Sequence, residues 1–342
     1  MIHYVDNIKY FKSYYLHKIF IHSLYKIIMI IVLITYPNIG MSENNYKDWL
    51  TQLEIDAMNR NITPEIFHEA MKSAKIIDKI KILDTKQPEK KITFNNYLKR
   101  SVSKNRIKLG KLNNNKYKDI LDKVSKEYNV QARFIVAIWG IETNYGSYTG
   151  NFSVISALTT LAYKGRRANF FRNELLSALQ ILNNNHVKLE NMFGSWAGAM
   201  GQSQFMPSSY LKYAQDFNKD GKKDIWNDHN DIFASIAYYL KSHGWDNSRT
   251  WGREVIIPKT LITNKDNLKL KNKSLKTWSK LGVLNKNGGK LPNISLKADL
   301  ILPDGPNEKS YLIYKNFKTI KKYNNSNYYA LVVGILSDGI AY

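Results

Sequence analysis

The most informative residue of the sequence is a glutamate near the end of an apolar, helix-like segment. Trp139, Ile138 and Ile135 precede Glu142 by three, four and seven residues, so all four share one stripe of a helix. Apolar surroundings and the negative end of the helix dipole both disfavour a charged carboxylate, which predicts a raised pKa. A carboxylic acid that stays protonated near neutral pH can act as a general acid. The alternative is a structural glutamate held by a buried arginine or by backbone donors.

A second candidate segment, 194–210, is rich in glycine and other small residues. Such residues let the chain pass close to a ligand or to another backbone segment. Ser195 and Gln204 add neutral hydrogen-bonding groups of the kind that bind sugar hydroxyls and amides. The alternative is a tight loop before a helix that begins at Pro207.

Helices dominate the region that must position these residues. Apolar periodicity predicts a helical stretch over 46–81 and helices over 117–128, 130–142, 153–163, 167–184, 207–217 and 231–243. Residues 85–98 are predicted to be extended, and 111–116 are interpreted as a polar loop. No alternating strand pattern interrupts 116–245, so the sequence predicts an all-helical body.

The pattern changes after Trp251. Residues 254–258 and 295–303 are typical of strands, and 275–281 of a short helix. Residues 311–320 are predicted to be extended, and 328–336 return to a helical apolar run. We therefore predict a small mixed insertion over about 251–315, in which no functional motif is recognisable.

The composition bounds the function without naming it. A chain of 342 residues with 44% hydrophobic and 23% charged residues can build a core. The absence of cysteine excludes disulfides, a thiol nucleophile, cysteine-ligated zinc, iron–sulfur clusters and a lipidated N-terminal cysteine. The 51 basic and 28 acidic residues give a formal charge of +23, which favours a polyanionic partner such as nucleic acid, an anionic membrane or an acidic cell-wall polymer. Lysine and asparagine recur throughout the chain, so compositional drift explains the charge equally well.

The N-terminus has the features of an export signal. A basic flank over 1–26 precedes an apolar run that starts at Ile27, then Pro37 and small residues around Gly40 and Ser42. The run is shorter than the roughly 20 residues that span a bilayer. Residues 1–42 are therefore predicted to be a signal peptide or, as the alternative, an uncleaved anchor, and translation could also start near Met29. Export places the rest of the chain outside the cytoplasm and weakens the nucleic-acid interpretation.

Three short motifs together resemble those of one family. Residues 140–146, which read Gly-Ile-Glu-Thr-Asn-Tyr-Gly, are followed by Gly-Ala-Met-Gly at 198–201 and Gln-Phe-Met-Pro-Ser at 204–208. In this order they resemble the lytic murein transglycosylase B family, glycoside hydrolase family 103, from about Trp49 to the C-terminus. The resemblance implies a mainly α, lysozyme-like catalytic body over 43–250, the small mixed α/β insertion over 251–315, and a return over 316–342 that completes the substrate groove.

The resemblance also implies a reaction. Glu142 falls on the family's single catalytic acid/base, and it is the only acidic residue between Tyr128 and Asn173. In the family's scheme this acid protonates the bond between N-acetylmuramic acid and N-acetylglucosamine, and the sugar's own 6-hydroxyl then closes a 1,6-anhydro ring. The alternatives are a hydrolytic muramidase of the same fold and a non-catalytic protein that binds peptidoglycan or another polyanion.

Substrate contacts are implied at positions that match the family. They are Ser195, Gln204, Asn324, Arg166, Arg167, Tyr145 and Tyr329. The serine and the glutamine would contact glycan near the scissile bond, the asparagine would face the acid, and the tyrosines would line the groove. The arginine pair would bind muropeptide carboxylates through forked donors. The alternatives are surface arginines and core aromatic residues.

The chemistry requires no cofactor, but the segment 216–231 resembles the front half of a calcium-binding EF-hand loop. The twelfth position is Asn227 rather than glutamate, and the family has a variant loop with a later aspartate. The expected ligands are Asp216, Asn218, Asp220, the Lys222 carbonyl and Asp231. Neighbouring lysines should weaken binding, and the alternative is a polar turn without an ion.

The resemblance implies peptidoglycan glycan strands as the partner, with cell-wall synthesis or division proteins as further candidates. A monomer is expected, and nucleic acid is not. The predicted location is the periplasm, either in soluble form or tethered by the N-terminus. A lipoprotein anchor is excluded, because the chain has no cysteine.

Overall fold

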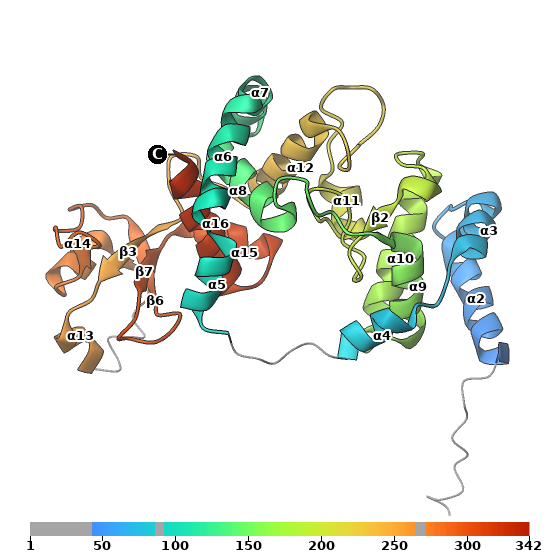
Figure 1. Cartoon of the computed structure of the whole chain (residues 1–342), viewed down its shortest axis with the longest axis horizontal. Coiled ribbons are helices and arrows are strands. Elements are labelled where there is room, and N and C mark those ends of the chain that lie inside the picture. The colour runs from blue at the N-terminus through green and yellow to red at the C-terminus, as the bar shows by residue number, and fades with distance from the viewer. Residues whose placement is uncertain (1–42, 86–91, 264–270, 342) are drawn as a thin grey trace, which may run out of the picture. The chain divides into compact units, whose positions relative to one another are not determined.

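The computed structural model describes residues 43–85, 92–263 and 271–341 (Figure 1). The predicted signal peptide or anchor, 1–42, lies outside these residues. Contacts divide the chain into two units, 1–53 and 54–342, and the helix α2 (Glu43–Met58) spans their boundary. Within the described residues, no helix combines the length and apolar character that a membrane crossing needs.

The second unit is mainly helical, as predicted. Its helical body contains α3 (Pro64–Ser73), α4 (Asp78–Thr85), α5 (Phe94–Ser101), α6 (Lys104–Lys116), α7 (Lys118–Tyr128), α8 (Ala132–Thr143), α9 (Val154–Lys164), α10 (Ala168–Asn183), η1 (Leu189–Asn191), α11 (Pro207–Tyr213), α12 (His229–Ser242), α15 (Lys315–Tyr323) and α16 (Asn327–Ala341). A two-stranded ladder, β1 (Phe152–Ser153) with β2 (Phe193–Gly194), lies inside this body.

The helix α8 is the centre of the main core. It packs against α16, α6, α12 and α7, and Figure 1 shows α6, α8 and α16 side by side. Its residues 134–140 are all buried, because an apolar sequence on every side of a helix is stable only when other elements surround it. The helix ends at Asn144, whose φ of 50° is left-handed, a common way to terminate a helix.

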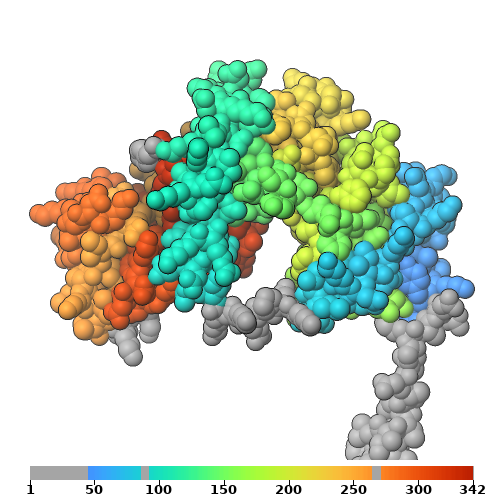
Figure 2. All heavy atoms as spheres, viewed as in Figure 1, coloured from blue at the N-terminus to red at the C-terminus, as the bar shows by residue number. Residues whose placement is uncertain are grey.

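A five-stranded antiparallel sheet forms the C-terminal subdomain. Its strands β3 (Gly252–Ile256), β4 (Lys273–Ser274), β5 (Leu284–Asn285), β6 (Lys297–Ile301) and β7 (Ser310–Ile313) are arranged in the order β4-β6-β7-β3-β5, with α13 (Lys259–Thr263) and α14 (Leu275–Lys280) beside them. The strand β7 is buried on both faces: Tyr311 and Ile313 join the core of the helical body, whereas Leu312 belongs to a second core with Trp278 of α14. In Figure 2 the orange subdomain adjoins the red C-terminal helices.

Several local predictions were wrong. Residues 85–98 were expected to be extended, but Thr85 ends α4, 86–91 lie outside the described residues, and 94–98 belong to α5. The N-terminus of α5 is capped by Thr93, whose hydroxyl accepts from the backbone N–H of Asn96. The expected polar loop 111–116 forms the last turns of α6. This helix has few apolar residues, and its close packing depends on Gly110, where a Cβ atom would lie 2.6 Å from the hydroxyl of Tyr145. Tertiary packing rather than periodicity determines this helix.

The segment 311–320 was also predicted to be extended. Only its first residues continue β7, and α15 begins at Lys315. Its aromatic and β-branched residues favour strands in isolation, but Phe317 and Ile320 lie three residues apart on one buried face of α15. The β1–β2 ladder is a further departure from the all-helical body that we predicted.

Candidate active site

Glu142 lies in the last turn of α8, on a stripe whose other members are buried. Ile135 and Ile138 are 0% exposed and Trp139 is 1% exposed, whereas Glu142 itself is only partly buried. Burial raises the pKa of Glu142 to about 7, and the hydrogen bond from Tyr329 opposes that rise. The carboxyl group is therefore protonated in a large fraction of molecules at neutral pH and is still accessible to a ligand.

The partners of Glu142 are tyrosines rather than cations. The hydroxyl of Tyr329 donates to Oε1 of Glu142 at 2.6 Å, and Tyr329 is 3% exposed. The ring of Tyr323 stacks on that of Tyr329, with 6.5 Å between centroids, and its hydroxyl donates to the Ser203 carbonyl at 2.6 Å. Burial, with the Glu142 charge adding to it, raises the pKa of both tyrosines and of Tyr97. Among the described residues no ion pair involves Glu142, so its acidity is set by burial and by neutral phenols.

Gln202, from the segment 194–210, connects that segment to the end of α8, which carries Glu142. The buried Gln202 accepts from the indole N–H of Trp139 at 2.8 Å and donates to the Trp226 carbonyl at 2.7 Å. The hydroxyl of Thr143 donates to the Gln202 carbonyl and accepts from the backbone N–H of Gly146. A Cβ atom at Gly146, where φ is +82°, would lie 2.4 Å from the Gln202 amide oxygen. The segment 194–210 therefore fixes the end of the helix that carries Glu142.

Ser195 and Gln204 hold turns within the segment 194–210. The Ser195 hydroxyl accepts from the backbone N–H of Ala199 at 3.0 Å. The side-chain amide of Gln204 donates to the carbonyls of Thr149 and Gly201, both at 2.9 Å. Both side chains are partly exposed, so each can meet a ligand while it holds the turn.

Tyr145 and Asn324 make no hydrogen bond to Glu142 among the described contacts. The Tyr145 hydroxyl donates to the Arg106 carbonyl at 2.8 Å, and its ring lies edge-on to Trp139. A Cβ atom at Gly140 would lie 2.6 Å from that ring. This arrangement matches the core-aromatic alternative for Tyr145. Asn324 ends α15 and is exposed, whereas the hydrogen bond to Glu142 comes from Tyr329.

The family follows from comparison with known proteins. Residues 45–338 match the family described as Transglycosylase SLT domain. The chain belongs to this family. Membrane-bound lytic murein transglycosylase B of Escherichia coli K12 is 32% identical over 288 residues, which are 80% of this chain and 77% of the relative. The predicted family and enzyme class are confirmed: the protein is a lytic transglycosylase.

Solved structures agree with this assignment. SltB3 from Pseudomonas aeruginosa, in complex with NAG-NAM-pentapeptide, has a TM-score of 0.83 and 40% identity, and the match covers 86% of this chain and 79% of SltB3. The Escherichia coli lytic transglycosylase Slt35, in complex with calcium, has a TM-score of 0.72 and 29% identity, with 85% and 92% covered. These matches confirm the lysozyme-like helical fold of the transglycosylase.

The arginine pair of the transglycosylase lies at the turn into α10 and contacts the protein itself. The backbone N–H of Arg166 donates to the buried carboxylate of Asp84 at 3.1 Å, and its guanidinium donates to the Asp84 carbonyl at 2.5 Å. The guanidinium of Arg167 lies over the rings of Phe170 and Phe171. Both arginines are exposed, and none of these contacts brings them to Glu142.

Three residues of this site were not identified from the sequence. Tyr97 lies on α5, which was expected to be extended, so no periodicity could place it near Glu142. Tyr323 lies in a segment that resembles the family, but its distance in sequence from Tyr329 does not indicate that the two rings stack. Gln202 could have been found, because it is a long polar side chain within the small-residue segment 194–210 that was already singled out.

The segment proposed to bind calcium forms a compact polar turn. The Asp216 carboxylate accepts from the backbone N–H groups of Asp220 and Gly221, and Asp220 accepts from that of Lys222. The side-chain amide of Asn218 donates to Asp220 at 3.1 Å and also to Asp228. The front half of the loop therefore has the oxygen-rich side chains that calcium prefers.

The carboxylate of Asp231 is engaged by backbone N–H groups of the loop. Its two carboxylate oxygens accept from the backbone N–H groups of Phe217 and Asp224, at 2.7 and 2.8 Å. It is fully buried, and burial raises its pKa to about 6. Across the described ranges, no group of three or more acidic or histidine side chains has the geometry to hold a metal. As it stands here, Asp231 ties the two ends of the loop together rather than closing an ion site.

Proposed function

We propose that this lytic transglycosylase cleaves the β-1,4 bond between N-acetylmuramic acid and N-acetylglucosamine in peptidoglycan, with Glu142 as its single acid/base. The reaction consumes no water and leaves 1,6-anhydromuramoyl ends. The observation that carries the proposal is a partly buried carboxyl group at the end of the apolar helix α8, hydrogen-bonded by the neutral hydroxyl of Tyr329. Burial raises its pKa to about 7. A group with this pKa can donate a proton and then take one back at neutral pH.

The lack of a second carboxylate acting on Glu142, among the described residues, supports this reaction type. Retaining and inverting glycosidases use two carboxylates, one on each side of the bond. The next acidic residue after Glu142 is Glu174, and both of its oxygens are engaged by the N–H and the hydroxyl of Ser208 at the start of α11. Glu174 therefore serves as a helix cap. In the proposed reaction the nucleophile therefore comes from the substrate itself.

Glu142 would act twice in the reaction. Its proton goes to the glycosidic oxygen as the bond from that oxygen to C1 of the muramoyl sugar breaks, and the 2-acetamido group of the same sugar supports the oxocarbenium-like centre. The carboxylate, stabilised by the hydroxyl of Tyr329, then accepts the proton of the 6-hydroxyl while the oxygen of that hydroxyl bonds to C1. Glu142 ends protonated, so one turnover restores the enzyme.

The substrate contacts follow from exposure and hydrogen-bonding capacity. We propose that Ser195, Gln204 and Asn324 contact glycan, because each presents a neutral polar side chain that is at least partly exposed. Arg166 and Arg167 are exposed cations suited to the carboxylates of a stem peptide. The pentapeptide bound to SltB3 supports a peptide contact in this family. Tyr329 would hydrogen-bond Glu142 rather than contact a sugar, and Tyr145 would pack against α8 at Gly140.

We also propose that the protein works outside the cytoplasm, in the periplasm, where peptidoglycan glycan strands are its partner. The support is the basic and apolar pattern of residues 1–42 and the relative in Escherichia coli that is described as membrane-bound.

A weak, structural calcium site in the loop 216–231 is a separate proposal. Asp216, Asn218 and Asp220, with the Lys222 carbonyl, would supply oxygen ligands. Asp231 would close the site only by exchanging its backbone hydrogen bonds for the ion, which should lower the affinity. Calcium would stabilise the loop and take no part in the chemistry.

A pair of glutamine variants tests the role of Glu142. Glu142→Gln should remain folded and release no soluble fragments from purified sacculi. Glu174→Gln alters another buried glutamate and should lower the melting temperature while the products stay the same. Fragment release by folded Glu142→Gln would overturn the proposal. Release of the same amount of product, but with hydrated muramoyl ends, by the wild type would instead identify a muramidase.

A further inference from the structure

The helices α8 and α16 run antiparallel and are joined by a polar contact near each end. At one end the hydroxyl of Tyr329 donates to Glu142 at 2.6 Å. At the other end the guanidinium of Arg133 donates to Asp338 at 2.7 Å. The two contacts are nine residues apart on both helices, or about 14 Å along the axis. Most residues between them belong to the apolar core.

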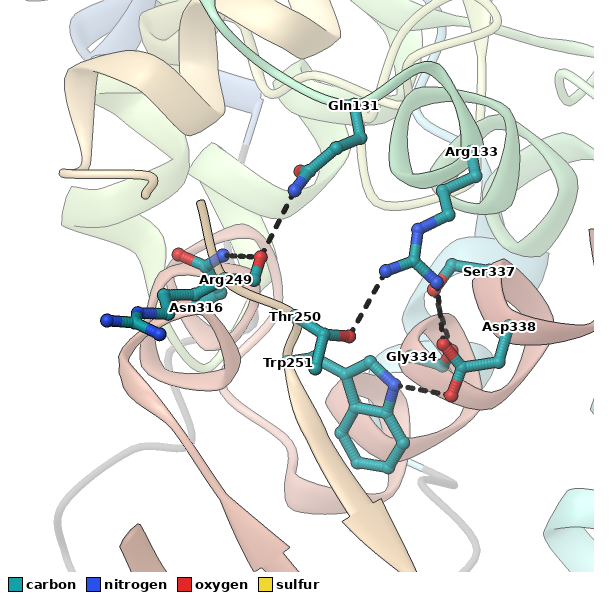
Figure 3. A network of polar contacts seen from close by, with 9 residues as sticks. All are labelled: Gln131, Arg133, Arg249, Thr250, Trp251, Asn316, Gly334, Ser337 and Asp338. Carbon is teal, nitrogen blue, oxygen red and sulfur yellow. Dashed lines mark hydrogen bonds and ion pairs between the residues drawn. The ribbon is translucent and has the colours of Figure 1, made fainter. Parts of the chain in front are cut away.

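The contact far from the active site is shared with the β-subdomain (Figure 3). The indole N–H of Trp251, the residue before β3, donates to the second oxygen of Asp338 at 3.0 Å. The guanidinium of Arg133 also donates to the hydroxyl of Thr250 at 3.2 Å. The ring of Trp251 lies against Gly334 of α16, where a Cβ atom would be 2.2 Å away. The start of the subdomain is therefore fixed to both helices at once.

The loop that leads to Trp251 is held from both sides. The side-chain amides of Gln131 and Asn316 both donate to the Arg249 carbonyl, at 3.1 and 2.9 Å, and both point toward it in Figure 3. The backbone N–H of Tyr314, where the chain leaves the sheet, donates to the Trp251 carbonyl at 2.9 Å. The entry and exit strands of the subdomain therefore meet at Trp251.

We propose that Arg133, Asp338 and Trp251 form a positioning device for the catalytic acid: they set the register of α16 on α8 and so hold the Tyr329 hydroxyl against Glu142. Apolar contact is non-directional and tolerates small sliding movements, whereas hydrogen bonds require defined distances and angles. The β-subdomain thus contributes to catalysis by seating Trp251, without touching substrate. This inference rests on the proposed role of Glu142.

The interpretation of a pH experiment depends on the charged and titratable groups that surround Asp338 and Glu142. Asp338 is faced by Arg133 and Lys286, and by the indole N–H of Trp251. Glu142 is faced by the neutral phenols Tyr97, Tyr323 and Tyr329. Because Tyr329 lowers the pKa of Glu142, a looser contact should raise that pKa. Asp338 lies about 14 Å from Glu142 along the helices and is partly exposed. At this distance solvent and salt screen its charge, so loss of that charge alone should hardly change the pKa of Glu142.

Asp338→Asn is the main test. The residue is partly exposed and lines a pocket of about 600 Å³, so the new amide can be hydrated and the fold kept. The alkaline limb of the pH profile of kcat/KM should move to higher pH by about half a unit, in the same direction as for Tyr329→Phe. In a Tyr329→Phe background, Asp338→Asn should produce no further shift, because it acts through that hydroxyl. Arg133→Lys keeps the positive charge but loses the guanidinium that donates to both Asp338 and Thr250. It should give a smaller shift of the same sign.

Asp56→Asn is the matched control, because Asp56 of α2 pairs with Arg172 of α10 at 2.7 Å, a carboxylate–arginine pair that involves neither α8 nor α16. It should lower the melting temperature without moving the alkaline limb. The inference is overturned if Asp338→Asn behaves in this way, if its shift persists in the Tyr329→Phe background, or if the limb moves downward. These results leave the role of Glu142 intact, whereas an active Glu142→Gln enzyme would remove the basis of both proposals.

Discussion

Tyr329→Phe is the change that isolates the hydrogen bond to the acid. It removes one hydroxyl, which donates to Glu142 at 2.6 Å, and keeps a ring that is 3% exposed. A hydrogen bond to a charged group contributes about 1.5–3 kcal/mol, and 1.36 kcal/mol corresponds to one pKa unit. The pKa of Glu142, about 7 in the wild type, should therefore rise by about one unit or somewhat more. The loss falls on the carboxylate form, so the first half of the reaction, in which Glu142 gives up its proton, should slow.

The assay is the pH dependence of kcat/KM for the release of soluble fragments from sacculi. The alkaline limb reports the protonated acid, so it should move upward, whereas kcat at neutral pH should fall about tenfold or more. Titration of Glu142 by NMR would give the same shift without turnover. An unchanged or lowered alkaline limb in a folded variant would refute the argument that Tyr329 stabilises the carboxylate. Tyr213→Phe, a tyrosine on α11, is the control for loss of a phenol elsewhere and should leave the limb in place.

Three further predictions concern stability. The folded-state pKa of Glu142 lies above its ordinary value of 4.5, so the stability that its neutral form provides is complete below that value and lost as the pH rises through about 7. Glu142→Gln should therefore raise the free energy of unfolding at pH 8 by about 1–3 kcal/mol and have little effect at pH 4, and equal effects at both pH values would contradict this reasoning. Gly198→Ala should cost about 2 kcal/mol or more in urea unfolding, because φ is +85° and a Cβ atom would lie 2.4 Å from Leu158. Gly221→Ala, with a similar φ of +88° but open space around it, should cost less, and an equal loss would assign the whole effect to the backbone. Calcium should raise the melting temperature of the wild type but not of Asp216→Asn, and an identical rise in both proteins would exclude the proposed loop.

The apolar stripe of α8 could be predicted because it is a local pattern. Three buried residues at helical spacing place Glu142 on the core side of its helix, and burial follows directly. Its hydrogen-bond partner could not be predicted in this way. Tyr329 lies 187 residues later in the chain, and only packing of α16 on α8 brings the two together. The family resemblance marked Tyr329, but as part of the groove.

Tertiary contacts also explain the wrong predictions. The helix α6 has a polar sequence, and close packing at Gly110 compensates for its weak periodicity. The helix α15 carries residues typical of strands, and its amphipathic face becomes evident only when Phe317 and Ile320 are seen to be buried together. The junction at Trp251 had no motif at all, because its contacts join α8, the loop before β3 and α16.

The most direct test of the proposed reaction is the source of the oxygen at the new muramoyl end. Purified sacculi would be digested with residues 43–342 in water enriched in oxygen-18, with Glu142→Gln in parallel, and the released muropeptides analysed by mass spectrometry. A single acid/base with an internal nucleophile predicts 1,6-anhydro products that are one water lighter than hydrolytic products and carry no label, and none of these products from Glu142→Gln. Labelled, hydrated ends would contradict it, because water rather than the 6-hydroxyl would then be the nucleophile.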